Sequence, residues 1–202
     1  VFMQFERRAD KSLVTLPAKH VDTGMGFERL CMVLQNKEYT YDTDIFTPFI
    51  RFIEKQSGKP YSGSYDRKNL TDVAMRVVSD HIRAVAFTIA DGQLPSNNGA
   101  GYVIRRILRR AVRYYYSFLD IQEPFLHTLV PLLATEFAHV FPELKAQEDF
   151  VKKVILEEEK SFLRTLEDGL RRIETVEIKD NVLDGRAAFE LYDTYGFPAD
   201  LT

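Results

Sequence analysis

The strongest constraint on the fold of this chain is a segment, about residues 102–118, that sorts arginines and apolar residues onto opposite sides of a helix. At about 100° per residue, its five arginines fall within roughly 140° of arc. These residues, which we call the arginine face, are Arg105, Arg106, Arg109, Arg110 and Arg113. The opposite side carries Ile104, Ile107, Leu108, Ala111 and Tyr115. Such a helix must pack its apolar side against other elements and turn the arginine face toward water or an anion.

Most of the remaining sequence also has a helical pattern. We predict further helices over about 42–58, 69–90, 125–139, 142–176 and 184–195. Asn69 or Thr71 is expected to begin the second of these helices, and Gly92 to end it in a left-handed conformation. Pro131 is expected to interrupt the third, because proline lacks the N–H that a helix interior needs. The fold class that follows is mainly α.

Two stretches rich in serine, glycine and proline separate the central helices. Residues 57–68 and 92–101 are predicted to be loops, because these residue types favour turns over regular structure. The first loop is also the best candidate for a domain boundary. We therefore predict one domain over residues 1–58 and a second, helical domain over residues 59–202.

The N-terminal part has a different pattern. Residues 1–8 and 12–22 are rich in apolar and β-branched residues around a polar turn, which predicts a β-hairpin. A glycine-rich corner over residues 22–30 then leads into a helix that should end near Asn36. Because Val1 stands inside an apolar run, we expect the chain to be part of a longer protein with an incomplete sheet at this end.

Composition excludes several classes of protein. The single cysteine, Cys31, cannot form an internal disulfide and suits the reducing cytoplasm. The four histidines lack the spacing of metal ligands and are expected to be surface or core residues: His20, His81, His127 and His139. No apolar run approaches the roughly 18 residues of a membrane span, so we expect no membrane association.

Charge is distributed unevenly along the chain. Residues 76–116 contain seven arginines but only two acidic residues, whereas residues 117–202 contain 9 basic and 18 acidic residues, and the net charge is −3. A basic segment in an acidic chain indicates a local anionic partner. The arginine face could be solvated, could pair with the acidic C-terminal third, or could bind phosphates. The absence of lysine from it favours bidentate contacts with phosphate or carboxylate.

The glycine-rich corner is a candidate ligand site. Its Gly24 and Gly26 allow a sharp turn and a close approach of the backbone to a ligand. Asp22 could hold an ammonium group and Arg29 a phosphate, so the corner could bind both ends of an aminoacyl-phosphate ligand. The pattern is also compatible with an Asp22 that caps the helix and an Arg29 that pairs with a neighbour.

Three stretches resemble the alanyl-tRNA synthetase family of class II aminoacyl-tRNA synthetases. HVDTGMGFERL, residues 20–30, resembles motif 3 of that class. Residues 80–116 resemble the tRNA-recognition region, and residues 183–202 the segment that leads to the editing domain. The resemblance implies a helical tRNA-recognition domain preceded by a truncated piece of an antiparallel β-sheet domain, the hairpin with the motif 3 helix.

The activity implied by the resemblance is the activation of alanine with ATP, followed by transfer of alanine to tRNA-Ala. Arg29 would be catalytic and bind the ATP phosphates, and Asp22 would hold the alanine ammonium group. Gly24 would leave room beside the methyl group, and Gly26 would let the backbone approach the nucleotide. ATP would enter with Mg²⁺, and zinc would belong only to the editing domain, which lies outside this sequence. Because motifs 1 and 2 would precede Val1, we expect the 202 residues alone to be inactive and to bind no cofactor.

The tRNA partner implied by the resemblance is the acceptor stem of tRNA-Ala with its G·U pair. Asn97 and Asp193 would read this pair in the minor groove while the arginine face holds flanking phosphates; Asn98 is an alternative to Asn97. Two other hypotheses remain open, a non-enzymatic helical RNA-binding module and a protein-interaction domain with an acidic partner. We expect the chain to be monomeric.

Overall fold

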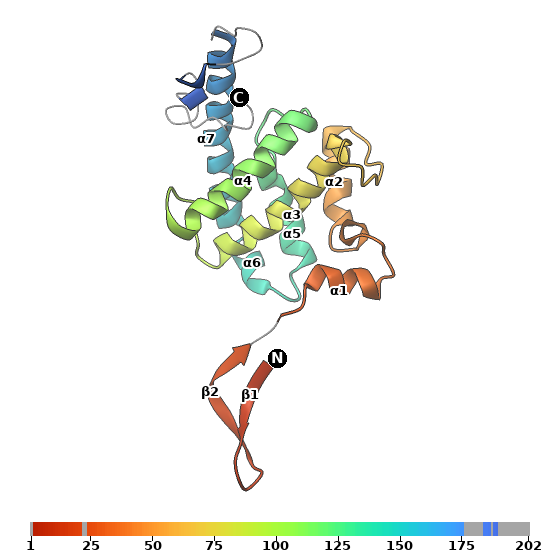
Figure 1. The fold of residues 1–202 in the computed structure, drawn as a ribbon, viewed down its shortest axis with the longest axis vertical. Coiled ribbons are helices and arrows are strands. Elements are labelled where there is room, and N and C mark those ends of the chain that lie inside the picture. The colour runs from red at the N-terminus through yellow and green to blue at the C-terminus, as the bar shows by residue number, and fades with distance from the viewer. Residues whose placement is uncertain (1, 22–23, 176–183, 187, 190–202) are drawn as a thin grey trace. The chain divides into compact units, whose positions relative to one another are not determined.

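The computed structural model describes residues 2–21, 24–175, 184–186 and 188–189. These residues are mainly helical, and their β-structure is one two-stranded antiparallel sheet (Figure 1). The predicted fold class is confirmed. The chain divides into two compact units, Val1–Thr47 and Pro48–Thr202. Within the described part of the chain, no helix combines the length and apolar character that crossing a bilayer requires.

The first unit contains the predicted hairpin. Strands β1 (Phe2–Arg7) and β2 (Leu13–Val21) pair antiparallel, and the register shifts between Met3 and Phe5. Lys11 in the connecting turn has a φ of 69°. After the corner follow helix α1 (Phe27–Leu34) and the 3₁₀ helix η1 (Thr40–Asp42). The side chain of Gln35 joins the two by exchanging hydrogen bonds with the carboxylate and the backbone N–H of Asp44.

The second unit is a bundle of helices. Its elements are α2 (Thr47–Ser57), α3 (Leu70–Ala90), α4 (Gly99–Phe118), η2 (Leu126–Leu129), α5 (Val130–Glu136), α6 (Pro142–Ala146) and α7 (Glu148–Thr175). Helices α3 and α4 pack against each other, and α7 contacts both α4 and η2 (Figure 1). Fully buried side chains from three of these helices, including Met75, Leu108 and Phe162, form the core between them. This packing fixes which side of α4 can face outward.

Both ends of α3 agree with the sequence prediction. The Asn69 side chain caps the helix by accepting a hydrogen bond from the Asp72 N–H at 3.2 Å. Gly92 follows the helix with a φ of 89°, the left-handed conformation that glycine adopts without steric cost. The start of α2 was predicted too early, because η1 precedes it and α2 begins only at Thr47, with Pro48 in its first turn.

Two of the predicted helices are divided differently in the structure. The helix predicted over 142–176 is broken at Gln147, whose side chain donates to the carbonyl of Ala90 at 2.9 Å, and is therefore the pair α6 and α7. Pro131 stands in the first turn of α5, where its missing N–H costs nothing, and η2 precedes it. The helix predicted over 184–195 lies mostly outside the described residues.

The predicted loop 57–68 is held firmly on α3. The buried carboxylate of Asp72 accepts hydrogen bonds from Ser62 and from the Ser64 N–H, the latter at 2.8 Å. Arg76 donates to the Ser64 carbonyl at 2.8 Å and lies 4.6 Å from the ring centroid of Tyr65. These contacts order a segment that has no regular structure of its own. The domain boundary after residue 58 stays a prediction.

Candidate nucleic-acid interface

The structure divides the arginine face into two rows along α4. Arg105, Arg109 and Arg113 are partly buried, and the first two contact residues of α7, whereas Arg106 and Arg110 are exposed. The opposite side is buried as predicted, with Leu108, Ala111 and Tyr115 at 0% exposure. Only the exposed row is therefore fully open to an external anion.

The half-buried row is partly neutralised by α7. A guanidinium nitrogen of Arg105 lies 2.7 Å from a carboxylate oxygen of Glu158. The Arg109 guanidinium lies 5.0 Å from the ring centroid of Phe162. Burial lowers the pKa of Arg109, and the Glu158 carboxylate opposes that change. The hypothesis that the arginines pair with the acidic C-terminal third is confirmed for Arg105.

The exposed row is held by tyrosines of the same helix. The guanidinium of Arg106 lies 5.8 Å from the ring centroid of Tyr102, and that of Arg110 lies 5.6 Å from that of Tyr114. Each pair is spaced by four residues, one helical turn, so each tyrosine restricts its arginine on the helix surface. A guanidinium that rests on a ring keeps its N–H edges available, which suits bidentate contact with phosphate.

Asn97 lies exposed in the loop that leads into α4. Its side-chain oxygen accepts a hydrogen bond from Arg105. Asn98, the alternative candidate, takes the N-cap position of α4 but makes no side-chain capping hydrogen bond. Asp193 lies outside the described residues, so its distance from Asn97 remains untested.

Gly101 holds the Asn97 loop close to α4. A Cβ atom on Gly101 would fall within 3.0 Å of the Leu94 carbonyl oxygen and of the Ser96 side chain. The Ser96 N–H donates to the Gly101 carbonyl at 3.0 Å, and the Ser96 hydroxyl donates to the Asn98 carbonyl at 2.8 Å. The close approach of backbone to backbone requires a residue without a side chain.

The substitution Gly101→Ala tests this packing. We expect it to displace the loop and to lower the free energy of unfolding by about 1–3 kcal/mol, the usual cost of overpacking. Denaturant unfolding gives the free energy, and hydrogen exchange at the Ser96 amide reports the loop. The control, Ala100→Ser, lies on an exposed position and should stay within about 0.5 kcal/mol. Unchanged Ser96 exchange in the alanine variant would contradict the proposed packing.

The glycine-rich corner belongs to the first unit, and its Gly24, Gly26 and Arg29 are exposed. Gly26 is the N-cap of α1 with a φ of −62°, which any residue can adopt, and a Cβ there would meet only Arg29, at 3.4 Å. A Cβ on Gly24 would have no neighbour within 4 Å. The described backbone therefore does not itself require either glycine. Arg29 lies exposed in the first turn of α1, and Asp22 is outside the described residues.

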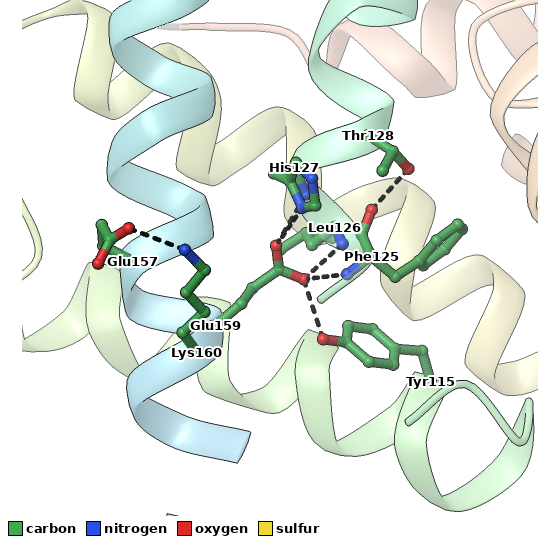
Figure 2. A network of polar contacts seen from close by, with 8 residues as sticks. All are labelled: Tyr115, Phe125, Leu126, His127, Thr128, Glu157, Glu159 and Lys160. Atoms are coloured by element: carbon green, nitrogen blue, oxygen red, sulfur yellow. Dashed lines mark hydrogen bonds and ion pairs between the residues drawn. The ribbon is translucent and has the colours of Figure 1, made fainter. Parts of the chain in front are cut away.

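A buried carboxylate of α7 that we did not predict connects α4, α7 and η2 (Figure 2). Glu159 is 0% exposed and accepts a hydrogen bond from the Tyr115 hydroxyl at 2.9 Å. It also accepts from the backbone N–H groups of Phe125, Leu126 and His127, and from the His127 ring at 2.9 Å. Burial, together with the Glu159 charge, raises the pKa of Tyr115 well above its usual range, so the hydroxyl stays protonated as a donor. Glu159 thus fixes the start of η2 on α7.

The described residues contain no group of three histidine, cysteine or acidic side chains that could hold a metal ion. Two histidines have carboxylate partners instead: His81 lies 2.9 Å from Asp80, and His127 lies 2.9 Å from Glu159.

The order of elements is a β-hairpin, a glycine-rich corner and then a series of helices that includes the arginine-rich α4. The sequence resemblance implied this order. Residues 1–202 match the family described as tRNA synthetases class II (A). The chain belongs to this family.

Individual relatives share one name. The chain is 63% identical over 206 residues to the alanine–tRNA ligase of Cytophaga hutchinsonii, and the match covers 100% of this chain and 23% of the relative. It is 58% identical over 204 residues to the alanine–tRNA ligase of Christiangramia forsetii, with the same two coverages. For the alanine–tRNA ligase of Porphyromonas gingivalis the identity is 58% over 208 residues, again with 100% and 23% covered. The chain therefore spans about a quarter of the length of the curated relatives that it matches.

Proposed function

We propose that this chain is part of an alanine–tRNA ligase, which activates alanine with ATP and transfers it to tRNA-Ala. Membership of the class II family and the identity over the whole chain with ligases of that name support this proposal. Because those relatives are much longer, the complete reaction is proposed for a longer protein, to which this chain contributes two parts. One part binds ATP and alanine, and the other binds the acceptor stem.

The second unit is proposed to bind the phosphates of the acceptor stem through α4. The observation that carries this role is the exposed row of Arg106 and Arg110, each resting on a tyrosine, on the helix that begins beside Asn97. Two guanidinium groups one turn apart, which form no ion pair with an acidic side chain among the described residues, provide a local positive surface in an acidic chain. Arg109 and Arg113 remain predicted phosphate contacts of lesser exposure.

Asn97 is proposed to read the G·U pair together with Asp193. In A-form RNA the accessible groove is the minor groove, in which guanine presents its N2 amino donor. A side chain that reads this donor must offer an acceptor, as an asparagine oxygen does. The exposure of Asn97 at the N-terminal end of α4 supports its part in this role, and Asp193 stays a prediction.

The first unit is proposed to contribute to the ATP and alanine site. Arg29 would bind the ATP phosphates and stabilise the charge that develops as pyrophosphate leaves. Asp22 would hold the alanine ammonium group, and Gly24 and Gly26 would allow close approach of the two substrates. Mg²⁺ would arrive with ATP as part of the substrate. The exposed position of Arg29 in the first turn of α1 is compatible with its part.

Binding to a short RNA hairpin that reproduces the acceptor stem tests the phosphate-binding role. We expect the double substitution Arg106→Gln and Arg110→Gln to reduce affinity about tenfold near 0.1 M salt. The salt slope, which is the slope of log affinity against log salt concentration, should fall in magnitude by roughly 1–2, because each lost phosphate contact lowers it by close to 1. Fluorescence anisotropy across a salt series measures both quantities. The loss should be equal for G·U and G·C stems, because phosphate contacts carry no sequence information.

Arg51→Gln is the matched control, because Arg51 is an exposed arginine on α2 and not part of the arginine face. It should leave both affinity and salt slope unchanged. An unaltered salt slope in the double variant would contradict phosphate binding by α4 and would favour a protein partner instead.

A further inference from the structure

Arg105 differs from the other arginines of α4 because its guanidinium joins two other parts of the second unit. One terminal nitrogen donates to the side-chain oxygen of Asn97 in the loop before α4. The other terminal nitrogen lies 2.7 Å from a carboxylate oxygen of Glu158 on α7. The side chains of Arg105 and Glu158 are only 19% and 17% exposed, so solvent screens this ion pair little.

The hydrogen bond from Arg105 determines which way the Asn97 amide points. A guanidinium has only donors, whereas a carboxamide has an acceptor oxygen at one end and a donor NH₂ at the other. The reversed amide would bring N–H groups against N–H groups, so Arg105 selects the orientation with the oxygen toward itself. The second lone pair of that oxygen and the NH₂ group remain available to a ligand.

The ion pair with Glu158 limits what else Arg105 can do. Its charge is compensated by a nearby carboxylate, and a move toward an RNA phosphate would break a charge-assisted hydrogen bond and leave Glu158 without this partner. Within the described part of the chain, Arg106 and Arg110 form no ion pair with a carboxylate, and both lie on the exposed row. Arg105 and the exposed row therefore suit different tasks.

We propose that Arg105 is a positioning residue for recognition of the base pair: held by Glu158, it orients the Asn97 amide toward the minor groove and does not itself neutralise a phosphate. This inference rests on the proposed function of α4 and Asn97. It assigns sequence preference to Arg105 and general affinity to the exposed row.

The test compares the same conservative change on the two rows. Arg105→Lys keeps the positive charge but replaces a two-sided guanidinium by a single ammonium, which cannot hold Asn97 and Glu158 in the same geometry. We expect the ratio of affinities for a G·U stem over a G·C stem to fall about tenfold in this variant, which is the usual cost of one mismatched base pair. The salt slope should not change. The matched control, Arg106→Lys, should keep the preference.

A double-mutant cycle separates positioning from a general structural role. If Arg105 acts through Asn97, then adding Arg105→Lys to Asn97→Ala should cause no further loss of preference, because the residue that it orients is already absent. Thermal unfolding checks that the variants keep their fold. Should Arg105→Lys fail to fold, Glu158→Gln provides the second test, since loss of the restraint on Arg105 should lower the G·U preference in the same direction.

Two results would overturn the inference in distinguishable ways. If Arg105→Lys and Glu158→Gln both keep the full G·U preference, Arg105 does not position Asn97, and the inference fails while the proposed function stands. If the unsubstituted chain binds both stems equally, the proposed reading of the base pair fails, and the inference fails with it.

Discussion

Replacing Glu159 with glutamine is expected to lower the free energy of unfolding by about 3 kcal/mol and the melting temperature by roughly 6–12 °C. Both carboxylate oxygens of Glu159 accept hydrogen bonds, one from Tyr115, Phe125 and Leu126 and the other from His127. Glutamine offers an acceptor at one end only and would direct its NH₂ group at donors. At 0% exposure, water cannot compensate for the lost acceptor.

Glu157→Gln is the matched control for this prediction, because it makes the same chemical change two residues earlier in α7 (Figure 2). Glu157 is 61% exposed and pairs with Lys160 at 3.3 Å, an arrangement that contributes about 0.5 kcal/mol or less. Chemical and thermal unfolding of both variants measure the difference. Equal stability of the two variants would mean that the hydrogen bonds to Glu159 do not hold η2 on α7.

The substitution Arg29→Gln should reduce ATP–pyrophosphate exchange in the proposed ligase by about 10²–10³-fold, the usual cost of removing one group that stabilises developing charge. Arg29 is exposed in the first turn of α1, so its loss should not change stability. The assay requires the longer ligase, because we expect the 202 residues alone to show no exchange.

Arg51→Gln serves again as the control and should leave exchange unchanged, since Arg51 is not among the residues proposed to bind ATP or alanine. Full exchange activity in the Arg29 variant would contradict the proposal that the glycine-rich corner binds ATP. A module that only binds RNA would instead show no exchange with or without Arg29 and would lose no RNA affinity when Arg29 is replaced.

Elements with strong local signals could be predicted from the sequence. The hairpin follows from two apolar stretches around a polar turn, and α3 follows from its periodicity, its Asn69 cap and Gly92. In each case neighbouring residues supply the stabilising interaction, as the hydrogen bond from the Asp72 N–H to Asn69 illustrates. The two sides of α4 were predicted for the same reason, because helical periodicity alone sorts them.

Errors occurred where a distant contact competes with the local pattern. The residues around Gln147 can continue a helix, and the break between α6 and α7 accompanies a hydrogen bond from Gln147 to Ala90, 57 residues earlier. Pro131 was expected to interrupt a helix but begins one, because η2 is fixed just before it by Glu159. The helix propensities of neighbouring residues give no information about either contact.

Three consecutive glutamates on α7 also show that the partners of a side chain cannot be predicted from the local sequence. In sequence, Glu157, Glu158 and Glu159 form one acidic run, which suggests a solvated helix surface. At about 100° per residue they point in three directions, and the structure uses each differently. Glu157 is exposed, Glu158 pairs with Arg105, and Glu159 is buried at the start of η2. The acidic run was the available signal, but it did not indicate which glutamate had which partner.

The sequence by itself determined that this chain is mainly helical, that α4 has an arginine face, and which family the chain resembles, because periodicity and motif order are properties of the chain alone. Only the tertiary structure decided which arginines remain open to a phosphate. Packing of α7 against one edge of α4 supplies a carboxylate and an aromatic ring to Arg105 and Arg109, and leaves Arg106 and Arg110 exposed. That choice depends on residues about 50 positions apart meeting in space, as Arg105 and Glu158 do with a separation of 53, and no local pattern encodes it.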